Sequence, residues 1–114
     1  WKSTRHARKV VEKACAALKR GDEKAFVSLF TKERQKKSAA REFQSRRAQA
    51  ERDGVTWTVM PSWAHSQRHM MSAVEKRDDG KISVYVVQLK KGEPQTWRQV
   101  RLVKEEGQWR VDYW

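Results

Sequence analysis

The 114-residue chain has few of the residues that cross-link or interrupt a fold. Cys15 is its only cysteine, which excludes an internal disulfide and a zinc site built on several thiolates. Because Cys15 falls on an apolar helical stripe, we expect it to be a small buried hydrophobic side chain. No apolar run approaches the roughly 20 residues that a membrane-spanning helix needs. Only two prolines and five glycines are present, and Gly80, Gly92 and Gly107 mark chain reversals.

Acidic residues are also scarce. The chain has 26 lysines and arginines against 14 aspartates and glutamates, a formal net charge of +12 at pH 7. Residues 1–53 hold 16 of the basic residues and 7 of the acidic ones, whereas residues 54–114 hold 10 and 7. The positive charge is therefore concentrated in the first half. Such a charge attracts nucleic acid, anionic lipid or acidic protein without selecting among them.

The first half of the chain is predicted to be helical. A first helix, capped by Ser3 or Thr4, is expected to run to about Lys19, because apolar residues recur there at helical spacing. Gly21 ends this helix, and Asp22 caps a short second helix. The two should form a helical hairpin.

A third helix is expected over residues 32–53, ended by Gly54, and the pattern then becomes that of an antiparallel sheet. Strands are expected over residues 55–59, 62–76, 82–89, 97–104 and 109–114. The stretch 62–76 also fits helical spacing, but a strand there pairs naturally across the turn at Gly80. The predicted fold class is therefore α+β in a single domain, residues 1–114, with helices over 1–53 and an antiparallel sheet of four to five strands over 54–114.

Strand alternation predicts which side chains face the core. The inward positions are Trp57, Met71, Tyr85, Val100, Leu102, Trp109, Val111 and Tyr113. The last strand should cover the helical hairpin, with Trp109 and Val111 against Leu18, Phe26 and Leu29. Asp112 then points outward, and Trp1 and Trp114 are expected at the surface.

Two segments resemble the nuclear transport factor two-like superfamily. They are the helical hairpin of residues 7–30, with Leu18-Lys19-Arg20-Gly21-Asp22 at its turn, and the closing hairpin of residues 100–111. The chain is most similar to a small bacterial branch often attached to the cell envelope. The resemblance implies helices packed on a curved antiparallel sheet in an open cone, with a pocket at the wide end, and pairing of cones through the outer sheet face. Related cones serve as isomerases, cyclases, ligand-binding domains or assembly modules, so the fold does not choose a function.

A ligand pocket in such a cone would draw on Trp57, His69, Met71, Tyr85, Trp97, Trp109 and Tyr113. Catalysis of the isomerase or cyclase type needs a carboxylate or histidine inside the apolar cone. The candidates are Asp112, His69 and Tyr85. However, no inward strand position places a carboxylate beside tyrosine and histidine, as the resemblance to catalytic members would require. We therefore assign no catalytic residue.

The sequence also contains candidate residues for metal binding and for anion binding. His65 and His69 would lie about 13 Å apart on a strand, with Arg68 between them, so we expect neither a metal nor a cofactor. A basic run could hold phosphates or anionic head groups: Arg34, Lys36, Lys37, Arg41, Arg46, Arg47 and Arg52. A solvated helix face explains the same run, because only Phe43 is interleaved with it.

The prediction is a non-catalytic binding or assembly module with a protein partner, the soluble domain of a bacterial envelope or multi-component complex. The partner could also be a second copy of the chain, in a homodimer. The alternatives are a small-molecule pocket enzyme or carrier and a basic nucleic-acid-binding accessory domain. The sequence starts at Trp1 rather than at a methionine, so we expect an upstream signal peptide, lipid anchor or membrane helix. Binding to anionic membranes or DNA should be weak and salt-sensitive.

Overall fold

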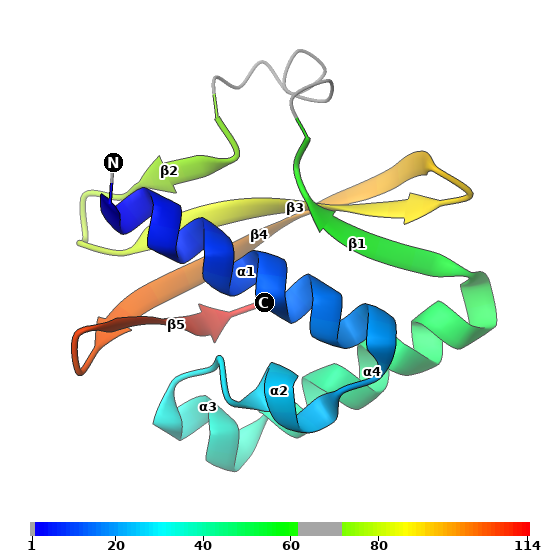
Figure 1. Ribbon diagram of the computed structural model, residues 1–114, viewed down its shortest axis with the longest axis horizontal. Coiled ribbons are helices and arrows are strands. Elements are labelled where there is room, and N and C mark those ends of the chain that lie inside the picture. Colours follow the sequence, from blue (N-terminus) through cyan, green and yellow to red (C-terminus); the bar gives the residue numbers. More distant parts are fainter. Residues whose placement is uncertain (1, 62–71) are drawn as a thin grey trace.

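The computed structural model describes residues 2–61 and 72–114. Four helices precede five strands (Figure 1). The helices are α1 (Lys2–Arg20), α2 (Glu23–Val27), α3 (Lys32–Lys37) and α4 (Ala39–Asp53). The strands are β1 (Val55–Val59), β2 (Val74–Lys76), β3 (Ile82–Lys90), β4 (Glu93–Glu105) and β5 (Gln108–Tyr113). The predicted α+β class, with helices before an antiparallel sheet, is confirmed. Of the predicted strand 62–76, residues 62–71 lie outside the described residues, and β2 covers its last three residues.

The strands form one curled antiparallel sheet, a half-barrel, in the order β1-β3-β4-β5. The short strand β2 also pairs with β3, on the same side as β1 but at the other end of β3. Two tight turns connect the long hairpins, and in each of them a non-glycine residue and a glycine both have positive φ: Lys91-Gly92 and Glu106-Gly107. Helix α1 lies across the sheet and contacts β1, β2, β3 and β5 (Figure 1).

The helix boundaries follow local capping chemistry with two departures. As predicted, Asp22 caps α2, because its Oδ1 accepts a hydrogen bond from the Ala25 backbone N–H at 3.1 Å. Helix α1 begins at Lys2, ahead of the expected cap. The predicted third helix is two helices, because Ser38 leaves helical geometry at φ −140°. This break lets α4 turn Ala39 into the core, whereas α3 buries none of its residues.

The inward strand positions are confirmed in part. Trp57, Val100, Leu102 and Val111 are buried. Tyr85 alternates with the core residues Val84 and Val86, so its ring lies on the outer face, contrary to the prediction. Tyr113 is also outside, with 48% of its surface exposed. The β4–β5 register shifts between Arg101 and Leu102, which brings the Arg101 guanidinium to 4.6 Å from the centre of the Tyr113 ring. Met71 lies outside the described residues.

The aromatic part of the core lies between the helices and the end of the sheet. Trp114, expected at the surface, is buried with its ring centroid 5.5 Å from that of Phe26. Phe26 also contacts Phe30 at 5.0 Å and Phe43 at 5.5 Å. Trp114 thus occupies the place beside Phe26 that the prediction gave to Trp109.

Trp109 itself is half-buried and lines a groove with Val10 and Leu29, so only its contact with Leu29 fits the prediction. The expected burial of Cys15 is confirmed, and desolvation raises the pKa of its thiol to about 12. None of the described helices combines the length and the apolar character needed to cross a membrane.

Candidate functional site

The residues predicted to line one pocket lie in three separate places. Trp57 is buried beneath a groove at β1, and Trp109 lines a different groove at the start of β5. The strand register places Tyr85, Trp97 and Tyr113 on the face of the sheet opposite that of Trp57, although Tyr85 and Trp97 are still partly buried against the core. The remaining two candidates, His69 and Met71, lie outside the described residues. The described candidates therefore do not form a single cavity.

A partly buried carboxylate, Glu42, lies between α4 and β4 and was not a candidate from the sequence. Glu42, on α4, is 2.7 Å from an Nη of Arg46 and 3.7 Å from an Nη of Arg98, and 28% of its side chain is exposed. Arg98 also donates a hydrogen bond of 3.4 Å to the backbone oxygen of Trp114. This carboxylate is therefore the partner of two guanidinium groups, and its pair with Arg98 joins α4 to β4. Its sequence signal was the i,i+4 pair with Arg46 beside the core residue Phe43.

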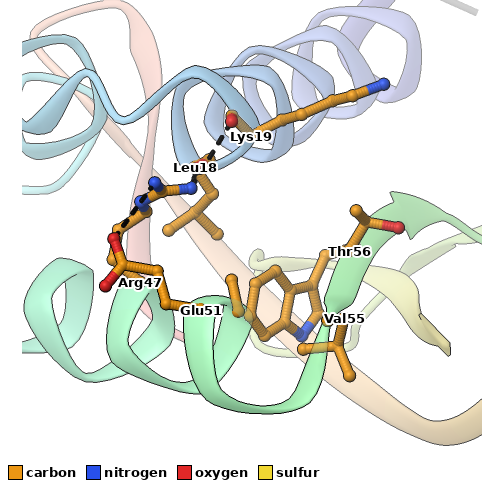
Figure 2. Close-up of a pocket in the computed structure, with 9 residues that line it drawn as sticks. Leu18, Lys19, Arg47, Glu51, Val55 and Thr56 are labelled. Atoms are coloured by element: carbon orange, nitrogen blue, oxygen red, sulfur yellow. Dashed lines mark hydrogen bonds and ion pairs between the residues drawn. The ribbon is translucent and has the colours of Figure 1, made fainter.

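A groove of about 340 Å³ opens between the end of α1, α4 and β1 (Figure 2). Its lining comprises Leu18, Lys19, Arg47, Ala50, Glu51, Gly54, Val55, Thr56 and Trp57. A second hollow, of about 510 Å³, shares Lys19, Thr56 and Trp57 and extends along α1 toward Pro61 and Leu89. Together the two hollows, here called the β1 groove, follow the whole length of β1.

Arg47 holds one end of the β1 groove (Figure 2). Its Nη1 donates to the backbone oxygens of Leu18 at 2.9 Å and Lys19 at 3.4 Å, and its Nη2 lies 3.5 Å from a carboxylate oxygen of Glu51. The last carbonyls of a helix have no partner within the helix and carry partial negative charge. Arg47 therefore caps the C-terminus of α1 and fixes α1 to α4.

The outer edge of β1 lies along the β1 groove. The Met60 backbone N–H donates to the Tyr85 oxygen at 2.8 Å, in register with the β1–β3 ladder. Because hydrogen-bonded and non-bonded pairs alternate in an antiparallel ladder, the backbone groups of Val55, Trp57 and Val59 face away from β3. Within residues 2–61 and 72–114, β1 pairs with no strand other than β3. One edge of the sheet is thus unpaired by the described chain.

The opposite edge of the sheet, at β5, is paired at its centre by backbone from another segment. The Val111 N–H donates to the Leu29 oxygen at 2.8 Å, and the Val111 oxygen accepts from the Thr31 N–H at 3.0 Å. This pairing is a parallel bridge between Phe30 and β5. Arg34 adds a hydrogen bond of 2.7 Å from its Nε to the Asp112 backbone oxygen. The segment between α2 and α3, together with Arg34, therefore satisfies the outward backbone groups of Val111 and the backbone oxygen of Asp112.

The residues of the predicted anion-binding run differ in their surroundings, and four of the seven are exposed. Arg34, Arg46 and Arg47 make the contacts described above. Arg52 pairs with Asp53 at 3.2 Å, and Lys37 pairs with Glu33 at 3.0 Å. Lys36 and Arg41 are exposed and have no ion pair within the described part of the chain. Five of the seven residues thus bind groups of their own fold.

The described residues include no group of three or more histidine, cysteine, aspartate and glutamate side chains placed to hold a metal ion. The sequence matches no protein-family model and has no significant match among curated proteins. The geometry of the grooves and sheet edges is therefore the basis for the functional conclusions.

Proposed function

We propose that this chain is a non-catalytic binding module of the nuclear transport factor two-like type that takes up an extended segment of a protein partner along β1. The observation that carries the proposal is the difference between the two sheet edges. The chain pairs the centre of the β5 edge, at Val111, with its own backbone, whereas no described residue pairs with the outer edge of β1. An added peptide strand would continue the ladder at the usual spacing of about 4.8 Å.

The composition of β1 supports this function. Free edge strands usually carry charged residues, a proline or a bulge that prevents another strand from pairing with them. The strand Val55-Thr56-Trp57-Thr58-Val59 has no charged residue and no proline, and its register with β3 is regular, without a bulge. The β1 groove lies beside this edge and offers apolar surface from Trp57 and Pro61 to alternate side chains of a bound strand. The net charge of +12 favours an acidic segment.

The curled sheet with α1 packed across it is compatible with the cone that the sequence resemblance implies. An assembly at the bacterial envelope is the setting that we infer from this resemblance. The alternative functions have less support. Glu42 is already paired with two arginines, which weighs against a pocket enzyme that would use this carboxylate. Five of the seven residues in the basic run bind groups within the chain, which weighs against a nucleic-acid surface.

The experiment is a selection of binders from a random peptide library, followed by N-methylation of each backbone nitrogen of the selected peptide. If the peptide pairs with β1, N-methylation should weaken binding about tenfold or more at every second position and little at the positions between. Recognition through side chains alone would give no period of two. That result, or a failure to select any binder, would contradict the proposal.

A variant of the protein tests the same edge. Val59→Pro removes an N–H that faces away from β3, while Val59→Ala shortens the same side chain and keeps the N–H. We expect the proline variant to lose peptide binding and the alanine variant to retain it, with both still folded by circular dichroism. Equal binding by the two variants would exclude pairing at β1.

A further inference from the structure

A second groove, separate from the β1 groove, lies between the N-terminal half of α1 and the start of β5. It encloses about 410 Å³, within the range of roughly 300–1,000 Å³ that is usual for small-ligand sites. Half-buried side chains of Val10, Leu29 and Trp109 supply its apolar surface. We call it the Trp109 groove.

Every charged side chain that lines the Trp109 groove is basic. Lys9 and Lys13 lie one helical turn apart on α1 and are exposed, with His6 one turn before them. Arg110 contributes from β5. Among the described residues that line the groove, none is acidic. The β1 groove differs in this respect, because acidic and basic side chains both line it.

Among the described residues, two basic side chains of the Trp109 groove, those of Lys9 and Lys13, are not paired with acidic residues nearby, whereas Arg110 interacts electrostatically with the Glu106 carboxylate. In the described part of the chain, Lys9 and Lys13 make no ion pair, and the neighbouring Glu12 pairs instead with Arg8 at 3.4 Å. Arg110 donates through Nη1 to the Ser28 backbone oxygen at 2.6 Å. Its Nε is enclosed and has no hydrogen-bond partner among the described residues. The groove therefore keeps the unpaired positive charges of Lys9 and Lys13 close to the indole ring of Trp109.

We propose that the Trp109 groove binds a small organic anion that combines a flat apolar body with a carboxylate, sulfonate or phosphate group. The apolar body would lie against Trp109 and Leu29, which already present apolar surface there. The anionic group would lie between Lys9, Lys13 and Arg110, where charges of a single sign in a concave surface strengthen the attraction. This site is independent of the proposed peptide binding at β1.

The test uses two dyes with the same rings: anilinonaphthalene sulfonate, which is anionic, and phenylnaphthylamine, which lacks the sulfonate. Each is titrated into the protein and followed by its fluorescence. In the double variant Lys9→Ser, Lys13→Ser we expect the affinity for the sulfonate to fall about tenfold and that for the neutral dye to change less than about twofold. Trp109→Ala should weaken both dyes.

The matched control is the double variant Lys36→Ser, Arg41→Ser, which removes the same net charge from exposed positions away from the groove. It should leave both affinities within about twofold of wild type, because exposed charges more than about 10 Å apart are screened at physiological salt. Equal losses in the two double variants would show a general charge effect and overturn the proposal. So would unchanged dye binding in Trp109→Ala. If Trp109→Ala does not fold, Leu29→Ser serves in its place with the same expected loss of both dyes.

Discussion

The capping of α1 by Arg47 makes the most direct prediction about stability. Arg47→Ala removes the guanidinium that binds the Leu18 oxygen at 2.9 Å and the Lys19 oxygen at 3.4 Å. A hydrogen bond to a charged group contributes about 1.5–3 kcal/mol to stability, and a cation at a helix C-terminus adds about 0.3–1 kcal/mol. Two features reduce the loss: the Leu18 oxygen also accepts from the Gly21 N–H at 3.3 Å, and the Glu51 carboxylate paired with Arg47 is 73% exposed.

We therefore expect Arg47→Ala to lower the free energy of unfolding by about 2 kcal/mol. In a domain of this size, that loss should lower the melting temperature by about 6–10 °C. Urea unfolding followed by tryptophan fluorescence measures the change, and the slope of free energy against urea should stay constant because the folded state keeps its surface. Arg47→Lys should lie between wild type and alanine, because an ammonium keeps the charge but not the planar fork.

The control is Arg41→Ala, on the same helix and with the same change in charge. Arg41 is exposed and has no ion pair within the described residues, so its replacement should change stability by less than about 0.5 kcal/mol. If Arg41→Ala and Arg47→Ala lost the same stability, capping of α1 would not be the function of Arg47, and the effect would be one of overall charge.

Three further predictions follow from the core and the helix caps. Trp114→Ala should cost about 3–5 kcal/mol in urea unfolding, because Trp114 is buried against Phe26, whereas Tyr113→Ala should cost far less. The Cys15 thiol, with its pKa raised to about 12 by desolvation, should react with Ellman's reagent only at the rate of unfolding; rapid labelling of the folded protein would contradict its burial. The hydrogen bond from the Ala25 N–H lowers the pKa of Asp22 below its ordinary value of 3.8. The stabilisation of the fold by this carboxylate is therefore complete above pH 3.8 and is lost as pH falls through the lower folded-state pKa. Asp22→Asn should abolish this part of the acid dependence in urea titrations from about pH 5 to 2.

The parts of the fold that depend on local chemistry were predictable from sequence. The Asp22 cap, the helix ends at Gly21 and Gly54 and the reversals at Gly92 and Gly107 each rest on a residue type that its own backbone geometry favours. The strand Val55–Val59 was predictable for a similar reason, because its alternation persists over the whole strand. These features need no knowledge of the tertiary partner.

The errors arose where a distant contact decides the outcome. A register shift in the β4–β5 ladder turns Tyr113 outward and allows Trp114 to reach Phe26, and no pattern within the last strand contains that information. The roles of the basic run depend on partners equally remote in sequence, such as the Asp112 backbone for Arg34 and the Leu18 backbone for Arg47. From the sequence, Arg34 and Arg47 are recognisable only as positive charges, whereas in the folded chain they donate hydrogen bonds to backbone oxygens.

The unpaired edge of β1 and the net charge of the chain together indicate what kind of partner strand would bind. An uncharged edge strand such as Val55–Val59 would ordinarily invite a second copy of the same chain to pair with it. Two copies that each carry a net charge of +12 repel one another, whereas an acidic segment is attracted over the same distances. The backbone of β1 would then determine where a partner strand pairs with the sheet, and the net charge of the chain would favour acidic segments over other segments as that strand. On this reasoning the excess of lysine and arginine acts against self-pairing even where individual arginines are occupied within the fold.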